Sequence, residues 1–160
     1  MPYDPVGTVR NRTLPGYGNT AFSPPHIASG KLWRGLRIGL LGGSFNPAHD
    51  GHRHISLMAL RHLGLDQVWW LVSPQNPLKP SHGMASMESR IEQAKRIARH
   101  PRIMVTDLEQ QLGTQYTSDT LPALKSAFHG TDFVWLMGAD NLSQIRYWDR
   151  WQSIFTTMPV

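Results

Sequence analysis

The sequence lacks cysteine altogether and contains no long apolar run. Without cysteine, the chain can form neither a disulfide framework nor a thiolate metal site, and a reducing compartment is permitted. No apolar run is long enough to cross a bilayer, and the first residues do not show the charged-then-apolar pattern of a secretory signal. These absences lead us to expect a cytoplasmic protein without a membrane-spanning segment.

Acidic residues are also scarce, since 11 Asp and Glu stand against 16 Lys and Arg, a formal net charge of +5. The excess is uneven. Residues 1–36 hold four basic residues and one acidic residue, so they carry +3, and the remaining residues carry +2. A nearly balanced folded part argues against a broad nucleic-acid surface, and it suits a small anionic ligand held in a cleft.

The 160 residues, 40% of them apolar, are enough for one sizeable core, so we expect a single domain with an extension. Residues 1–34 contain five prolines and four glycines, and they show neither helical nor strand periodicity. We therefore predict a flexible N-terminal extension over residues 1–34 and a folded domain over residues 35–160.

From residue 36 onward, short apolar runs alternate with amphipathic helical patterns. The apolar runs predict strands at 37–41, 67–73, 103–106 and 133–138. The helical patterns predict helices at 51–63, 86–100 and 118–128. Ser86 and Ser118 are expected to cap the second and third helices. Such alternation is typical of βαβ units, so the expected fold is a Rossmann-like α/β domain, an open parallel sheet with helices on both faces.

Polar segments follow three of the predicted strands, at Gly42–His52, Gln75–Lys79 and Gly138–Asn141. In an open parallel sheet, ligands bind outside the carboxyl ends of the strands, at the point where the strand order reverses. Because all three segments follow the carboxyl ends of parallel strands, we expect them to converge there in one cleft.

The segment Gly42–His52 carries the strongest chemical signal. Its paired glycines follow a buried strand, so bare backbone amides can approach an anion. His49 and His52 are three residues apart, so both imidazoles can project toward one side of the N-terminus of the next helix. Free amides and the helix dipole favour anions at that position. Gly51 keeps the corner open, and the whole pattern predicts a phosphate site.

A metal site is the alternative interpretation of these histidines, with His54 as a possible third ligand. No Glu or Cys completes a familiar ligand set within the motif, and zinc sites in proteins are usually completed by such residues. We therefore favour phosphate binding by His49 and His52 and expect no metal site formed by the protein itself.

These residues resemble the nucleotidyltransferase superfamily marked by a His-x-Gly-His signature, and the wider pattern GGSFNPAHDGH is similar to bacterial nicotinate-mononucleotide adenylyltransferases. Three further segments resemble that family in order: PQNPLK, Tyr116–Leu121, and Met137–Leu142 with Trp148. Family members continue to another strand and a late Ser/Thr-rich motif ending in Arg. Ser153–Thr157 does not match that motif, so we expect a domain that is incomplete at its C-terminus.

The resemblance implies an enzyme that transfers the AMP part of ATP to nicotinate mononucleotide and releases pyrophosphate, a step of NAD biosynthesis. The acceptor phosphate is already anionic, so no general base is needed. Catalysis then depends on in-line positioning and on neutralising charge at the phosphoryl oxygens. Mg²⁺ is expected to arrive with ATP, bridging its phosphates and keeping mostly water and phosphate ligands.

The resemblance also implies roles for individual residues. His49 and His52 are the catalytic pair, as phosphate stabilisers. The residues expected to bind ATP or phosphate are Gly42, Gly43, Ser44, Phe45, Gly51, Lys79, Gly138 and Asp140. The residues expected to bind the mononucleotide are Tyr116, Thr117 and Trp148. Among these, the two aromatic side chains would pack against the pyridine ring, and Thr117 would recognise the nicotinate carboxylate.

Several alternatives stay open. Lys79 is equally well explained as a solvated loop lysine, and Asp140 as the cap of the next helix. Trp69, Trp70 and Trp135 lie in or beside strand runs, so we expect them in the core.

Two other functions also compete with the leading hypothesis. One is the same adenylyl transfer to another phosphorylated acceptor, such as phosphopantetheine. The other is a non-catalytic nucleotide- or RNA-binding protein, which the basic extension and the missing late motif favour. The preference between nicotinate and nicotinamide mononucleotide, and the oligomeric state, are not decided by the sequence.

Overall fold

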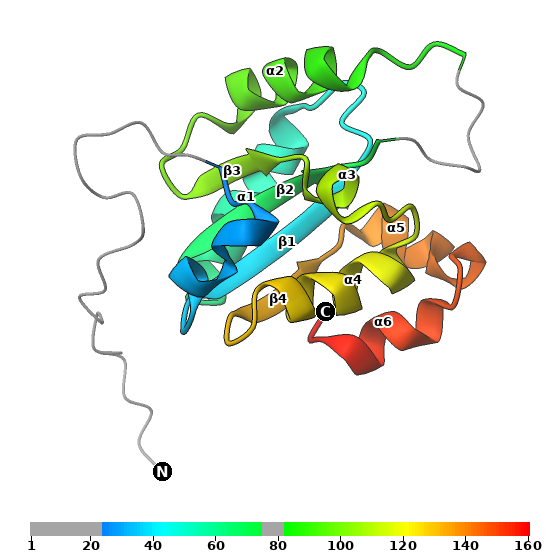
Figure 1. Cartoon of the computed structure of the whole chain (residues 1–160). Coiled ribbons are helices and arrows are strands. Elements are labelled where there is room, and N and C mark those ends of the chain that lie inside the picture. The colour runs from blue at the N-terminus through cyan, green and yellow to red at the C-terminus, as the bar shows by residue number, and fades with distance from the viewer. Residues whose placement is uncertain (1–23, 75–81) are drawn as a thin grey trace.

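The computed structural model describes residues 24–74 and 82–160, and within them a parallel sheet of four strands forms the centre of the molecule (Figure 1). The strands are β1 (Arg37–Gly43), β2 (Gln67–Val72), β3 (Ile103–Thr106) and β4 (Asp132–Leu136), in the spatial order β3-β2-β1-β4. This sheet confirms the expected Rossmann-like α/β fold. The segment Gln75–Lys79 and residues 1–23 lie outside the described residues.

The strand order reverses beside β1. The chain moves outward from β1 to β2 and β3, and then returns to place β4 on the opposite side of β1. Leu40 pairs with Trp69 of β2 on one side and with Trp135 of β4 on the other. The loops after β1 and β4 therefore diverge at the carboxyl edge of the sheet, where parallel α/β proteins bind their ligands.

Helices cover both faces of the sheet (Figure 1). The longer ones are α1 (Asp50–His62), α2 (Met87–Ala98) and α4 (Thr117–Ala127). Trp69 and Trp70 are neighbours in β2 and point to opposite faces, yet both are 0% exposed. Trp70 packs in a cluster with residues of α1 and α2, and Trp69 packs in a second cluster with residues of α4. Burial on both faces explains why the strands read as continuous apolar runs.

The structure adds short elements that the periodicity did not predict: α3 (Leu108–Leu112), α5 (Ala139–Gln144), α6 (Trp151–Thr157) and the 3₁₀ helix η2 (Ile145–Tyr147). Ser86 caps α2 as expected, since its hydroxyl accepts from the Ser89 amide. The expectation for Ser118 is wrong, because α4 begins earlier, with Tyr116 as its N-cap. The Ser118 hydroxyl instead donates to Asp149 at 3.0 Å.

The boundary of the extension at residue 34 also needs correction. Residues Ile27–Trp33 form a 3₁₀ helix, η1, whose first turn is capped by His26. Trp33 is 3% exposed and packs in the core cluster on the α4 face, and Gly30 lies so close to the Ala127 carbonyl that no side chain would fit. The folded domain therefore includes Ile27–Trp33 and begins before residue 35. The five prolines of residues 1–34 all lie before η1, so none of them interrupts this helix.

The last residues of the chain lie beside β4, because the Trp135 amide donates to the Pro159 carbonyl at 2.8 Å. Over the described residues, no helix is long and apolar enough to cross a membrane.

Candidate active site

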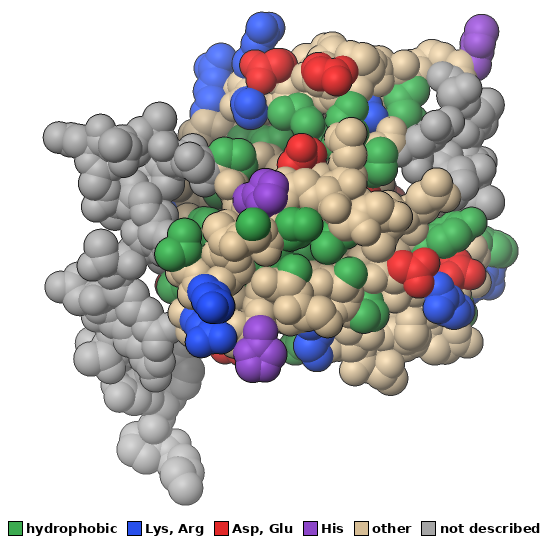
Figure 2. All heavy atoms as spheres, in the orientation of Figure 1, with side chains coloured by type: hydrophobic (Ala, Val, Ile, Leu, Met, Phe, Trp, Pro, Cys, Tyr) green, Lys and Arg blue, Asp and Glu red, His purple; other side chains and the backbone are tan. Residues whose placement is uncertain are grey.

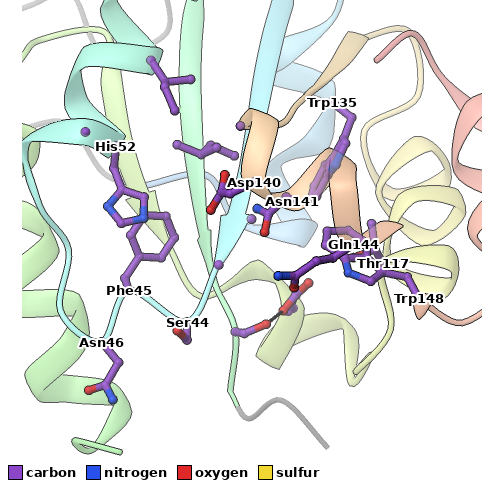
Figure 3. Close-up of a pocket in the computed structure, with 18 of the residues that line it drawn as sticks. Ser44, Phe45, Asn46, His52, Thr117, Trp135, Asp140, Asn141, Gln144 and Trp148 are labelled. Atoms are coloured by element: carbon purple, nitrogen blue, oxygen red, sulfur yellow. Dashed lines mark hydrogen bonds between the residues drawn. The ribbon is translucent and has the colours of Figure 1, made fainter. Parts of the chain in front are cut away.

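A single cavity of about 560 Å³ at the carboxyl edge of the sheet brings the sequence-predicted site residues together (Figure 3). Its volume suits a ligand of nucleotide size. The predicted residues that line it are Gly42, Gly43, Ser44, Phe45, His49, Gly51, His52, Tyr116, Thr117, Gly138, Asp140 and Trp148. Lys79 belongs to the part of the chain that the structure does not describe. The expected convergence of the loops after β1 and β4 is therefore observed.

The loop after β1 is held in one conformation by close packing. A Cβ atom on Gly42 would lie 2.4 Å from the Trp135 ring, so the strand can approach this ring only with glycine. Phe45 has a φ of 47°, which is costly for a residue with a side chain. Its ring stacks on Trp70 at 5.0 Å between centroids, and it lies 4.7 Å from the His52 ring. These contacts fix the turn that presents the loop amides to the cavity.

His49 and His52 cap the N-terminus of α1 with their side chains. His49 is the N-cap, and its Nδ1 accepts from the Gly51 amide at 3.1 Å. The His49 amide in turn donates to Nδ1 of His52, also at 3.1 Å. Because both Nδ1 atoms accept, each neutral ring carries its proton on Nε2. The cap therefore leaves both rings with an N–H donor on the side away from the helix end.

His52 is set up as a neutral donor. Burial lowers the pKa of His52 below its ordinary value of 6.5, and charge on the neighbouring His49 acts in the same direction. Asp140 across the cavity has a smaller, opposite effect on this pKa. A bound anion would likewise favour the charged form, so His52 can donate a hydrogen bond with or without an added proton.

The far side of the cavity is formed by Thr117, Gln144 and Trp148, which lie together in Figure 3, opposite His52 and Phe45. An exposed charge network holds this side in place. Arg150 donates to Asp119 of α4 at 2.6 Å and to Asp149 at 2.8 Å.

The Asp149 carboxylate also accepts from Ser118, so the chain beside Trp148 is tied to the first turn of α4. No local pattern in the sequence indicates this network, because Ser118–Asp149 and Asp119–Arg150 are each 31 positions apart. Tyr116 is at the edge of the cavity and is 38% exposed.

Asp140 lies between these two sides (Figure 3). Its interpretation as the helix cap is wrong, because Gly138 is the N-cap of α5 and Asp140 is in the first turn. A Cβ on Gly138 would lie 2.6 Å from the Asp140 carboxylate, so glycine is required there for this carboxylate to keep its position.

Sequence reasoning missed Glu109, a buried carboxyl group that lines the cavity at the start of α3. It is 3% exposed, and it accepts from the Ser73 hydroxyl at 2.7 Å and from the Thr120 hydroxyl at 3.4 Å. Burial raises the pKa of Glu109, although both hydroxyl donors partly offset the rise. The residue lies in a helix of only five residues that has no recognisable motif, so composition and spacing could not single it out.

The charges around the cavity are unexpected for a phosphate site. Its charged lining residues among those described are Glu109, Asp140 and Asp149, with no Lys or Arg. Among the described residues, the groups that can attract anions are therefore backbone amides, the N-terminus of α1 and the histidine N–H groups. Across residues 24–74 and 82–160, no group of three His, Cys, Asp or Glu side chains is arranged to hold a metal ion. A ligand set that includes His54 therefore gains no support.

Comparison with known proteins places these features in context. Residues 40–160 match the family model described as cytidylyltransferase-like. The chain is 62% identical over 129 residues to the "Probable nicotinate-nucleotide adenylyltransferase" of Parvibaculum lavamentivorans, covering 81% of this chain and 64% of that protein. It is 58% identical over 123 residues to the protein of the same name from Cereibacter sphaeroides, covering 77% of this chain and 66% of that protein. The chain thus spans about two thirds of the length of these relatives.

Solved structures share the fold at lower identity. The putative nicotinate-nucleotide adenylyltransferase from Vibrio parahaemolyticus superposes with a TM-score of 0.62 at 21% identity, covering 78% of this chain and 75% of that one. The Plasmodium falciparum nicotinic acid mononucleotide adenylyltransferase complexed with NaAD superposes with a TM-score of 0.64 at 19% identity, covering 78% and 72%.

The glycine between the two histidines provides a first test of the site. A Cβ on Gly51 would lie 2.9 Å from both Nδ1 and Cε1 of His49, so Gly51→Ala should push this ring out of its capping position. We expect the affinity for inorganic pyrophosphate, measured by calorimetry, to fall about as far as in His49→Ala. If the effect acts through His49, adding Gly51→Ala to His49→Ala will change little. Additive losses in the double variant would contradict this.

Glu109 predicts a dependence of stability on pH. Since its folded-state pKa is raised, the folded chain binds this proton more tightly than the unfolded chain. The carboxyl group therefore lowers stability as pH rises above the ordinary Glu value of 4.5. We compare the free energies of unfolding of Glu109→Gln and the unmodified chain by urea denaturation. The difference between them should shift in favour of the variant when the pH is raised from 5 to 8. The exposed Glu88→Gln is the matched control, and an equal change with pH in both variants would refute the assignment.

Proposed function

The chain belongs to the cytidylyltransferase-like family, and on that premise we propose that it transfers the AMP part of ATP to nicotinate mononucleotide. The products are nicotinate adenine dinucleotide and pyrophosphate, a step of NAD biosynthesis. The observation that carries this proposal is the joint arrangement of the cavity. A glycine-rich loop with two histidine donors forms one side, and Thr117 and Trp148 form the other side of the same cavity.

The names of related proteins support the same reaction. Curated relatives at 54–62% identity are named nicotinate-nucleotide adenylyltransferases, and the Plasmodium structure carries NaAD, the product named here.

Surface charge agrees with a small ligand. On the face shown in Figure 2, Lys and Arg side chains of the described residues lie in separate small groups and form no continuous basic area.

The proposed mechanism follows from the geometry of the cavity. The acceptor phosphate attacks the α-phosphorus of ATP, a bond to this oxygen forms, and pyrophosphate leaves with the electron pair of the broken P–O bond. The amides of the loop after β1 and the Nε2–H groups of His49 and His52 donate to the phosphoryl oxygens as negative charge increases. Mg²⁺ would arrive with ATP and would supply positive charge that neutralises its phosphates.

The remaining site residues have proposed binding roles. Trp148 packs against the pyridine ring and Thr117 recognises its carboxylate, with Tyr116 at the edge of the same side. Asp140 accepts from the ribose hydroxyls of the nucleotide at the centre of the cavity. Lys79 completes the set as a phosphate contact. The proposed nucleotidyltransferase domain comprises η1 together with residues 35–160, since Trp33 of η1 packs in the core.

The reaction is tested by measuring pyrophosphate release from MgATP with three acceptors in parallel: nicotinate mononucleotide, nicotinamide mononucleotide and phosphopantetheine. We expect release with nicotinate mononucleotide, reduced about a hundredfold to a thousandfold in His52→Ala, because one preorganised donor to the phosphoryl oxygens is lost. Release with phosphopantetheine alone would establish the alternative acceptor. Absence of release with every acceptor would refute adenylyl transfer by this chain.

The pyridine site is tested by Trp148→Ala. Loss of aromatic packing should raise the KM for nicotinate mononucleotide about tenfold and leave the KM for ATP nearly unchanged. Tyr147→Ala is the matched control, since this neighbouring aromatic residue is 67% exposed and is not part of the cavity. An unchanged KM for nicotinate mononucleotide in Trp148→Ala would place the pyridine ring elsewhere.

A further inference from the structure

Arg90 of α2 is a buried cation behind the cavity. The residue is 1% exposed. Among the described residues, its guanidinium group donates only to backbone carbonyls: those of Ser44 and Ser73 at 2.7 Å, Ala85 at 3.0 Å and Pro74 at 3.1 Å. Ser44 follows β1, and Ser73 and Pro74 follow β2. One side chain therefore joins the two loops that leave neighbouring strands at the ligand-binding edge.

Hydrogen bonding alone does not explain a charged residue in this place. Within the described residues, the ion pairs are all at exposed side chains, and none includes Arg90. A buried charge without a carboxylate partner costs considerable free energy. Burial lowers the pKa of Arg90, but a guanidinium group stays protonated at neutral pH. The guanidinium charge of Arg90 is thus retained at a cost to the stability of the fold, and it lies behind the cavity proposed to bind anions.

The charge of Arg90 reaches the cavity through the peptide that it contacts. The Ser44 carbonyl belongs to the same peptide group as the Phe45 amide, and a donor to the carbonyl polarises that N–H. Phe45 also has the costly φ of 47°, a conformation that lasts only where its surroundings impose it. Arg90 holds this corner from one side, and the stacked Trp70 ring supports it from the other.

Asn46 strengthens the same connection. Its side chain donates to the Gly83 carbonyl and accepts from the Ala85 amide, so the loop after β1 is tied to the segment that enters α2. Arg90 donates to the Ala85 carbonyl of that segment. The loop is therefore anchored to α2 at more than one point.

We propose that Arg90 is a positioning residue that adds positive charge to the phosphate site from behind. It fixes the loop after β1 against the end of β2, and it raises the affinity of the loop amides for the di- or triphosphate part of a nucleotide without touching the nucleotide. This inference rests on the proposed function only in that the cavity binds a phosphate chain. It does not depend on which acceptor is used.

The test compares Arg90→Met, Arg90→Lys and the unmodified full chain. We expect Arg90→Met, which keeps the apolar stem but loses donors and charge, to bind inorganic pyrophosphate at least about tenfold more weakly by calorimetry. Arg90→Lys keeps the charge and should recover part of the affinity. Arg96→Met is the matched control, because Arg96 lies exposed on the same helix. In turnover, the KM for ATP should rise more than the KM for nicotinate mononucleotide.

A second measurement, on the unmodified chain, tests the proposal even if the Arg90 variants do not fold. In the unmodified chain, the Arg90 Nε–H and Phe45 amide signals in nitrogen–proton NMR spectra should shift along one titration curve with pyrophosphate. An unmoved Arg90 signal at saturation would overturn the inference, as would equal pyrophosphate affinity in folded Arg90→Met. Binding without turnover would refute the proposed reaction and leave the role of Arg90 standing. No binding by the unmodified chain would overturn both.

Discussion

Parallel pairing of β1 with both β2 and β4 is the constraint on which the site depends. Since β1 lies between two partners and both faces of the sheet are covered, its backbone can reach a ligand only beyond one of its ends, and the cavity lies at the carboxyl end. There Gly42 passes against the Trp135 ring, and the chain turns through Phe45 into α1. The packing that stabilises the core thus also determines the conformation of the loop after β1. A change in the core beside this loop would therefore alter the site.

The electrostatic attraction of the site for anionic ligands is largely indirect. The described cavity wall bears carboxylates and no Lys or Arg, although the proposed ligands carry several negative charges. Backbone dipoles, a helix N-terminus and histidine N–H groups on this wall can still attract phosphates. Arg90 provides a fixed positive charge one layer behind, where it cannot move toward the ligand. Such preorganised dipoles need little rearrangement as charge develops during phosphoryl transfer.

The sequence predicted what depends on local pattern. Alternating periodicity was sufficient for the parallel sheet and the three longer helices, and the spacing of glycines and histidines was sufficient for the loop after β1. Local pattern was insufficient where the role of a residue depends on partners that are distant in the sequence. Ser118 looks like a cap but bonds to Asp149, and η1 looks like an extension but packs on the core. Arg90 and Glu109 occupy ordinary polar positions in helices, and only the tertiary fold shows that both are buried.

The pair of histidines illustrates how one local structure can satisfy two requirements. An N-cap of Ser, Thr, Asp or Asn is the usual choice for stability. Ser, Thr and Asp use an oxygen on the helix amides and carry no side-chain N–H that could remain for a ligand. Imidazole has two nitrogens, so His49 and His52 can accept helix amides at Nδ1 and still donate from Nε2. The cap determines the tautomer, and the tautomer determines the donor. The spacing of three residues follows from the capping geometry, in which residues N-cap and N3 face each other, and Gly51 leaves space for the first ring. A signature of two histidines around a glycine is therefore the sequence form of a helix end that caps itself while offering hydrogen-bond donors to an anion.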